Sequence, residues 1–275
     1  MRSVFQRLPL TIAVAAAILV AASSLIGFTA PRAAADPADV DGVAACAGLP
    51  SHAALKSALT AARQQLNGGF NLDMWATLVN RDGIVCAVAF TGANRGDQWP
   101  GSRVISAQKA NTANAFSLPA LALSTANLYS AVQPGGSLYG LQHSNPVDTQ
   151  VAYHGPAANF GQANDPMVGH RIGGVNVFGG GLALYNASHT LVGAIGVSGD
   201  SSCADHNIAW RTRSSLKLDY VPAGVSGDPM RPDNIVYDIA LASGEQEGVS
   251  TSGWGHPVCS ASATMIAGTL PAVRH

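Results

Sequence analysis

Residues 179–213, GGGLALYNASHTLVGAIGVSGDSSCADHNIAWRTR, contain the clearest signals of secondary structure in this chain. After three glycines this stretch contains two short apolar runs, 182–186 and 191–198, with polar turn residues between them. This pattern is typical of two paired antiparallel strands. The second run is apolar on both faces, which predicts a central strand that is covered on each side. Gly193 and Gly196 within it indicate close approach of another backbone or a bulge.

A helix is predicted directly after the second strand. Ser202 and Asp205 have the spacing of a capping box, in which each side chain satisfies a free backbone N–H of the first turn. His206, Trp210 and Arg213 follow at positions i, i+4 and i+7. We therefore expect these three side chains to share one face of the helix.

The remaining elements follow from local periodicity and turn signals. Apolar residues recur at helical spacing after Ser51, and the pair Asp82-Gly83 between two β-prone runs is a strong hairpin signal. The predicted elements, in chain order, are a helix at about 51–66, strands at 74–80 and 84–91, helices at about 103–117 and 121–132, and a short strand at 235–240.

The N-terminal residues have the pattern of an export signal. Arg2 and Arg7 precede an apolar run at 10–28, and Ala33-Ala34-Ala35 offers a small-residue cleavage site, so we expect a mature chain from Asp36 that is secreted or held in the cell envelope. An uncleaved membrane anchor is the alternative, because about 19 apolar residues can span a bilayer. We expect cleavage and no membrane attachment afterwards.

Composition indicates a globular protein, since 47% of the 275 residues are hydrophobic and 11% are charged. Residues 134–174 lack a regular period, and we interpret them as a surface insertion. Repeated Pro and Gly beyond residue 218 mark a boundary. The expected organisation is a signal at 1–35, an arm at 36–50, a single domain at 51–220 with its insertion at about 134–174, and a tail at 221–275.

Charge argues against a nucleic-acid partner. The whole chain has 15 basic and 16 acidic residues, and the signal contains Arg2, Arg7 and Arg32 but no acid. Without those three arginines, 12 basic residues face 16 acidic ones, a formal charge of −4. No basic cluster remains that would neutralise a run of phosphates.

All four cysteines lie in the expected mature chain, and an even number in an exported protein favours disulfides. Three pairings are possible. We favour Cys46 with Cys86 and Cys203 with Cys259, which would tie the arm to a strand and the tail to the last helix. A lipid-modified Cys46 is the competing interpretation, but acidic residues separate it from the apolar run.

An ordered set of motifs now resembles a known family. The set comprises RVISAQKANTANAF at 103–116, the glycines at 179–181, LVGAIGVSG at 191–199, and Asp205 at the start of the last helix. Together they resemble the haem-binding HbpS/GlcG family, which is related to the C-terminal domain of PduO, over about residues 51–217 without the insertion. The insertion, the four cysteines and the tail depart from the family pattern.

The resemblance implies an α+β fold, an α-β-α sandwich of the profilin/roadblock-like kind, with a five-stranded antiparallel sheet flanked by helices. It also implies homo-oligomers and haem as the cofactor, with modest haem-degrading activity in some members. We therefore expect a secreted haem-binding protein with an accessory role in haem degradation or redox sensing. A catalytically inert envelope or interaction protein on the same fold is the alternative.

Local chemistry supplies the candidate haem contacts. Lys109, Thr112 and Phe116 share one helix face and offer a cation for a propionate, a hydroxyl and an aromatic ring. An ordinary amphipathic helix would show the same spacing.

Haem iron takes His, Met, Cys or Tyr as its axial ligand, and His206 is our candidate for the metal. Its helix face carries Trp210 for stacking and Arg213 for a carboxylate. The other interpretation of His206 is a solvated helix histidine. The insertion adds His143, His154 and His170, whose spacing matches no zinc pattern.

One further motif suggests a different activity. Ser106-Ala-Gln-Lys109 matches S-x-x-K, the nucleophile and base of penicillin-recognising serine enzymes. The K-T-G motif that accompanies it in those enzymes does not occur in the sequence. A serine acyl-enzyme is therefore the weakest of the three hypotheses.

Overall fold

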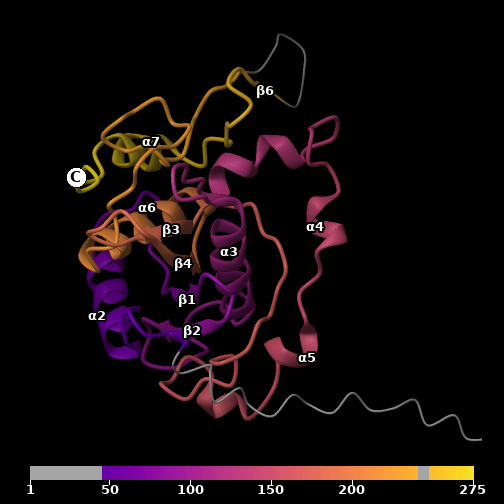
Figure 1. Cartoon of the computed structure of the whole chain (residues 1–275), viewed down its shortest axis with the longest axis vertical. Coiled ribbons are helices and arrows are strands. Elements are labelled where there is room, and N and C mark those ends of the chain that lie inside the picture. The colour runs from indigo at the N-terminus through magenta and orange to yellow at the C-terminus, as the bar shows by residue number, and fades with distance from the viewer. Residues whose placement is uncertain (1–44, 241–247) are drawn as a thin grey trace, which may run out of the picture. The chain divides into compact units, whose positions relative to one another are not determined.

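An antiparallel sheet of four strands forms the centre of the protein, in a computed structural model that describes residues 45–240 and 248–275. The strand order is β2-β1-β4-β3, so β4, the second apolar run, is central as predicted (Figure 1). The expected signal at 1–35 lies outside the described residues. The strands are β1 (Trp75–Asn80), β2 (Val85–Phe90), β3 (Gly181–Tyr185) and β4 (Leu191–Ser198).

Helices cover both faces of this sheet. One face packs against α3 (Ser102–Phe116), and the other packs against α2 (His52–Arg63) and α6 (Ser202–Ser215). The backbone of α3 runs so close to β4 that a Cβ atom on Gly196 would overlap the Ser106 carbonyl oxygen. The close approach expected at this glycine is therefore present. The layers match the predicted flanked antiparallel sheet.

The expectation of five strands is wrong, because neither segment beside the sheet extends it. At the β2 edge, Val85 bonds to the backbone of Gly169 and His170, and at the β3 edge Tyr185 bonds to that of Leu218 and Tyr220. Each flanking segment pairs with a single strand residue. Beside β3 the chain then reaches Pro222, which has no N–H for a further ladder bond.

Two local expectations are also corrected. The helix predicted at 121–132 is replaced by two 3₁₀ helices, η1 (Thr125–Leu128) and η2 (Ser130–Val132). The Ser124 and Asn127 side chains bond each other and the backbone there, which competes with a regular helix. At α6 the cap is Ser201 rather than Ser202, because the Ser202 hydroxyl accepts a hydrogen bond from the Gly179 N–H instead.

The insertion packs along α3 rather than away from the domain (Figure 1). It contains α4 (Leu141–Ser144), α5 (Thr149–Ala152) and η3 (Ala157–Asn159). Ala152, Met167 and Ile172 of the insertion are buried against the α3 side of the sheet. The insertion is thus part of the core on that face.

The C-terminal tail covers α6. It contains β5 (Ile239–Ala240), β6 (Val249–Ser250) and α7 (Ala261–Gly268), and Ala263 and Ala267 of α7 are buried in the same core as α2 and α6. The disulfides Cys46–Cys86 and Cys203–Cys259 confirm the favoured pairing. Among the described residues, no helix combines the length and apolar character needed to cross a membrane.

Candidate functional site

Lys109 and Asp205 form a buried ion pair between α3 and α6. The Lys109 Nζ lies 2.7 Å from Asp205 Oδ2 and also donates to the Val197 carbonyl oxygen at 3.1 Å. Asp205 Oδ1 accepts a hydrogen bond from the Asp200 N–H. Burial raises the pKa of Asp205 to about 6, and the Lys109 charge opposes that rise. Lys109 therefore links two layers of the fold and is not exposed for a propionate.

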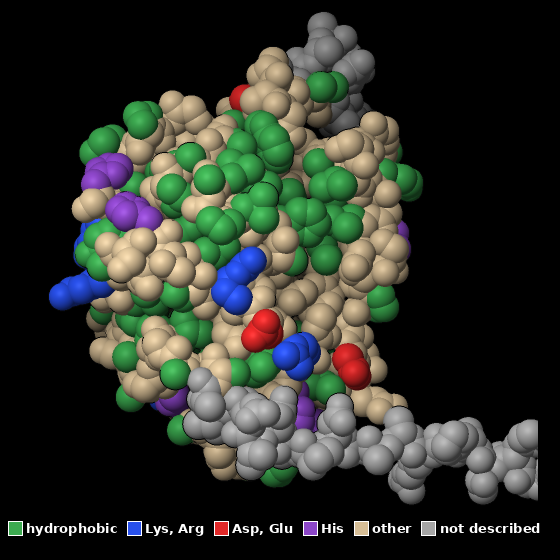
Figure 2. All heavy atoms as spheres, viewed as in Figure 1, with side chains coloured by type: hydrophobic (Ala, Val, Ile, Leu, Met, Phe, Trp, Pro, Cys, Tyr) green, Lys and Arg blue, Asp and Glu red, His purple; other side chains and the backbone are tan. Residues whose placement is uncertain are grey.

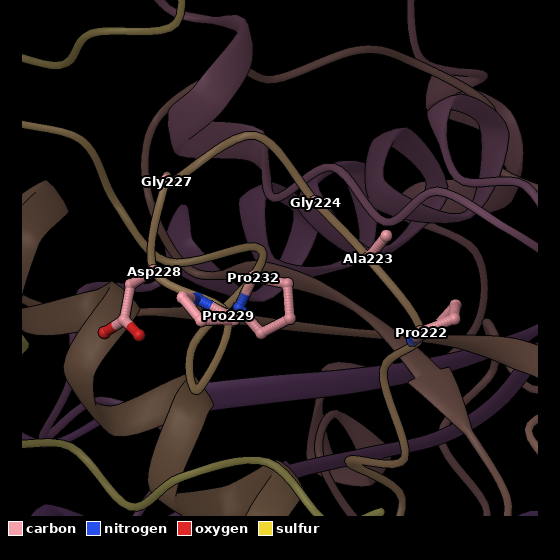
Figure 3. Close-up of a pocket in the computed structure, with 7 residues that line it drawn as sticks. All are labelled: Pro222, Ala223, Gly224, Gly227, Asp228, Pro229 and Pro232. Atoms are coloured by element: carbon pink, nitrogen blue, oxygen red, sulfur yellow. The ribbon is translucent and has the colours of Figure 1, made fainter.

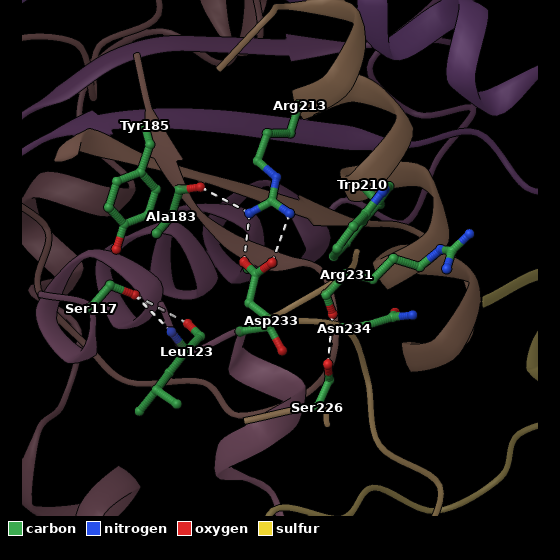
Figure 4. Close-up of polar contacts among 12 residues, drawn as sticks. Ser117, Leu123, Ala183, Tyr185, Trp210, Arg213, Ser226, Arg231, Asp233 and Asn234 are labelled. Atoms are coloured by element: carbon green, nitrogen blue, oxygen red, sulfur yellow. Dashed lines mark hydrogen bonds and ion pairs between the residues drawn. The ribbon is translucent and has the colours of Figure 1, made fainter. Parts of the chain in front are cut away.

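His206, Trp210 and Arg213 do share one face of α6, as predicted, but the C-terminal tail covers that face. The Arg213 guanidinium lies over the Trp210 ring at 4.5 Å, and the His206 and Trp210 rings are 6.0 Å apart. Arg213 donates to both carboxylate oxygens of Asp233, at 2.5 and 2.9 Å (Figure 4). All three side chains are at most 1% exposed.

His206 is held by the tail through its Nε2 atom, which lies 3.1 Å from Asn234 Oδ1 and 3.2 Å from the Ile235 nitrogen. Its Nδ1 atom is buried without a partner among the described residues. Burial lowers the pKa of His206 to about 3, so the ring is neutral at pH 7. We call Lys109, Asp205, His206, Arg213 and Asp233 the buried centre.

Thr112 and Phe116 serve the packing of α3. The Thr112 hydroxyl donates to the Gln108 carbonyl oxygen at 2.7 Å and accepts from the Asn176 N–H at 3.0 Å. Phe116 packs against the apolar cluster that contains Leu123. As folded, neither these two residues nor the buried centre offers a surface to a haem. A haem contact at the predicted residues stays a prediction, and for His206, Trp210 and Arg213 it requires the tail to leave α6.

Ser106 and Lys109 do not form a nucleophile and base. The Ser106 hydroxyl lies 2.8 Å from that of Thr77 and donates to the Arg103 carbonyl oxygen at 2.7 Å. Both Ser106 and Lys109 are buried, and the Lys109 amine forms an ion pair with Asp205. The S-x-x-K motif therefore has a structural explanation in the contact of α3 with the sheet.

An open pocket that the sequence analysis did not predict lies at the N-terminal end of α3. Its volume is about 560 Å³, within the range of small-molecule sites. Three separate parts of the chain build it: the start of β1, the loop and helix start at 94–104, and the insertion. We call it the aromatic pocket, and its lining residues are Trp75, Asn94, Arg95, Gly96, Pro100, Gly101, Arg103, Val104, Tyr153, Ala157 and Phe160.

A buried hub around Asp165 holds the insertion wall of this pocket in place. Asp165 accepts hydrogen bonds from the Arg103 guanidinium and from the Gly161 and Met167 N–H groups. The Arg103 guanidinium also donates to the Ala152 carbonyl oxygen at 2.7 Å and lies 3.7 Å from the Phe160 ring centroid. Arg103 is thus held by the wall through three hydrogen bonds and is 2% exposed, so its charge is paired with Asp165.

Arg95 differs from Arg103 because no described carboxylate neutralises its charge. It lies exposed in the loop before α3 and forms no ion pair with any residue that the structure describes. Tyr153 is 60% exposed. Of the side chains that line the aromatic pocket, Tyr153 alone is of a type that binds haem iron. The sequence analysis did not identify Arg95 and Tyr153 as site residues because they are 58 positions apart. The aromatic rings of Tyr153 and Phe160 in a polar insertion were the signal that could have indicated a site.

The insertion histidines lie outside this lining. His143 and His154 are exposed and His170 is half-buried, so the structure does not gather them into one site. A second pocket of about 310 Å³ is lined by prolines, glycines, Ala223 and Asp228 (Figure 3). The Asp228 carboxylate is bound by Arg231 at 2.9 Å, and no aromatic ring or cation lines this pocket.

The family comparison covers the sheet, α2, α3, most of α6 and the aromatic pocket. The family model described as "Haem degrading protein HbpS-like" matches residues 51–213, more than half of the chain. The chain belongs to the HbpS-like family. The match ends at Arg213, so the tail residues that close the buried centre of this HbpS-like chain lie beyond it.

Three solved structures are similar to this HbpS-like chain at low identity. A structure of a PduOC:haem complex is 24% identical and covers 59% of this chain and 89% of its own, with a TM-score of 0.41. The Klebsiella pneumoniae protein ORFY is 24% identical, covering 61% and 90%, with a TM-score of 0.39. HbpS is 15% identical, covering 60% and 86%, with a TM-score of 0.37. No curated protein matches the sequence.

Proposed function

We propose that this protein binds haem, and that the haem occupies the aromatic pocket. The observation that carries the proposal is the combination of three aromatic rings, Trp75, Tyr153 and Phe160, with the unpaired cation of Arg95 around about 560 Å³. Membership of a family described as haem degrading supports the choice of ligand. The buried centre is the competing location, and it does not fit a haem as folded.

The lining residues match the chemical needs of an iron porphyrin. Phe160 offers apolar contact over the ring, while Trp75 lines the pocket with 1% of its surface exposed. Arg95 offers a charge-assisted hydrogen bond to a propionate. Tyr153 offers a phenolic oxygen of the kind that ligates haem iron. When bound, haem would supply an iron centre for electron transfer or for chemistry with oxygen. The chain itself orients the ring and limits access of water from the insertion side.

A hemin titration of the purified protein tests this proposal. We expect a Soret shift that saturates, a loss of affinity in Arg95→Gln, and an altered Soret position in Tyr153→Phe, since the axial ligand sets the electronic environment of the iron. His143→Ala is the matched control, because His143 is an exposed insertion residue outside the pocket. A protein that gives no Soret shift would instead be the inert interaction protein of the same fold.

Degradation of the bound haem is a further part of the proposal, supported by the family description. Bound hemin should lose Soret absorbance under a mild reductant and oxygen faster than free hemin does. If bound hemin is stable under these conditions, the protein binds haem without degrading it.

We infer export to an oxidising compartment. Two disulfides support it, because such bonds persist outside the reducing cytosol. The expected mature N-terminus is Asp36. Intact mass of the secreted protein checks both points, and a retained signal or titratable thiols in the unreduced chain would contradict them.

We also infer a homo-oligomer. Residues 110–147 contain no Asp, Glu, Lys or Arg, and Figure 2 shows a face with many hydrophobic and few charged side chains. Leu66, Phe70 and Met265 are also 68–86% exposed, more apolar exposure than a monomer needs. Light scattering over a concentration series should give a multiple of the chain mass. A constant single-chain mass would reject assembly.

A further inference from the structure

Three side chains that can ligate a metal meet where the tail joins α6. The ligand atoms of Cys203, His256 and Cys259 all lie within 4.8 Å of one another. A tetrahedral zinc site with Zn–S of about 2.3 Å and Zn–N of about 2.0 Å separates its ligand atoms by roughly 3.5–4 Å. Within the described ranges, no other group of three such residues is so arranged. In the oxidised protein the two sulfurs are bonded to each other.

The sulfur of Cys259 is placed for exchange with a dithiol. Cys259 is exposed, whereas Cys203 is buried in the first turn of α6. The Cys203 N–H points to Cys259 Sγ at 3.2 Å. A backbone donor and the positive end of a helix both favour the thiolate form of a nearby cysteine. Reduction would therefore produce two thiols in an environment that stabilises their anions.

The His256 ring is held in place by hydrogen-bond partners at both of its nitrogens. Its Nδ1 atom lies 2.7 Å from the Pro257 carbonyl oxygen, and its Nε2 atom lies 2.7 Å from the Ser202 hydroxyl. Metal-binding histidines commonly donate one ring N–H to a carbonyl so that the other nitrogen presents its lone pair. Here Nδ1 is the donor and Nε2 faces the hydroxyl. The Tyr129 ring, 5.0 Å away, packs against the imidazole.

We propose that opening the Cys203–Cys259 disulfide creates a Zn²⁺ site made of the two cysteine sulfurs and His256 Nε2, with the Ser202 hydroxyl or a water as the fourth ligand. A dithiol attacks Cys259 Sγ, the S–S bond breaks, and the dithiol becomes a cyclic disulfide as two electrons pass to the protein. The two resulting thiols then release two protons as they bind the cation.

This site is independent of haem and of the aromatic pocket. Its consequence is for the tail, because a bound cation would replace the disulfide as the link between α6 and the residues that cover His206. Under reducing conditions the cation would add to the contacts of Asp233 and Asn234 that also hold the tail on α6.

The test is a zinc titration of the full mature protein before and after reduction by dithiothreitol, with the reductant removed under nitrogen and a chromophoric chelator as competitor. We expect no uptake by the oxidised protein and one Zn²⁺ per chain after reduction. The Cys46→Ser/Cys86→Ser variant should behave in the same way, because it keeps the site and lacks the other thiols. The Cys203→Ser/Cys259→Ser variant should bind none.

Two readouts separate ligation from folding. Co²⁺ added to the reduced wild-type protein should give thiolate-to-cobalt charge-transfer bands, and X-ray absorption of the zinc form should show two sulfur ligands. His256→Gln should weaken zinc binding at least tenfold while its thiol count and near-ultraviolet circular dichroism stay unchanged. Zinc uptake that survives in Cys203→Ser/Cys259→Ser, or a reduced and folded wild-type protein that binds no zinc, would overturn the proposal.

Discussion

The buried centre and the aromatic pocket use their charges in opposite ways. In the buried centre, Lys109 faces Asp205 and Arg213 faces Asp233, so each cation is neutralised inside the fold. In the aromatic pocket, Arg103 is paired with Asp165, but Arg95 is exposed and forms no ion pair with a described residue. Cations on a helix face therefore indicate a ligand site only when the tertiary structure leaves them unpaired.

The largest effect should follow from breaking the pair in the buried centre. Arg213→Ala leaves Asp233 as an uncompensated buried charge, and we expect a loss of about 3–5 kcal/mol in the free energy of unfolding. Urea denaturation measures it. The double variant Arg213→Met/Asp233→Leu should recover most of the loss, because it removes both charges. A cost below about 1 kcal/mol for Arg213→Ala would mean that the tail does not cover this face.

Acid should destabilise the folded protein through its buried histidines. Burial lowers the pKa of His206 to about 3 and that of His256 to about 4, so unfolding takes up two protons between pH 4 and 6. Asp205, with its pKa raised to about 6, releases one proton on unfolding in that window. One net proton is taken up, so stability should fall by about 1.4 kcal/mol per pH unit as the pH drops from 6 to 4.

Denaturant unfolding at a series of pH values checks this slope. His206→Gln removes one of the two histidines, and it should make the slope close to zero in the same window. A slope that is unchanged in this variant would show that His206 is accessible to water in the folded protein.

A smaller effect is expected where the tail holds His206. Asn234→Ala removes the oxygen that meets His206 Nε2 and the amide that donates to the Ala267 carbonyl oxygen. We expect a loss of about 1–3 kcal/mol in stability and no change in hemin affinity. A hemin complex with a new Soret position in this variant would place the iron at His206, as the sequence first suggested.

The smallest effect on stability is expected in the aromatic pocket. Arg95→Gln changes an exposed, unpaired side chain, so stability should stay within about 0.5 kcal/mol of the wild type. Hemin affinity should fall about tenfold, equivalent to about 1.4 kcal/mol, because a charge-assisted hydrogen bond is lost. Fluorescence quenching by hemin measures the affinity. Lys56→Gln, on α2 and outside the pocket lining, is the matched control.

Several elements with local sequence signals were predicted correctly. Two hairpins, the helices α2, α3 and α6, and the central position of β4 follow from periodicity, turn residues and apolar runs. These signals are reliable because a few neighbouring residues provide most of the backbone and capping interactions. The motif set likewise indicated the family that residues 51–213 confirm.

Whether the candidate site residues are buried and paired depends on long-range contacts that local patterns do not show. Asp233 and Asn234 come from beyond the predicted domain, and their contacts with Arg213 and His206 turn a helix face into a buried centre. The aromatic pocket likewise joins Trp75, Arg95 and Phe160 from separate segments. Burial and pairing of a charge depend on which distant segments pack against it, and a local sequence pattern does not identify those segments. The free energy of desolvation depends on the folded structure, so the accessibility and charge of a site also depend on it.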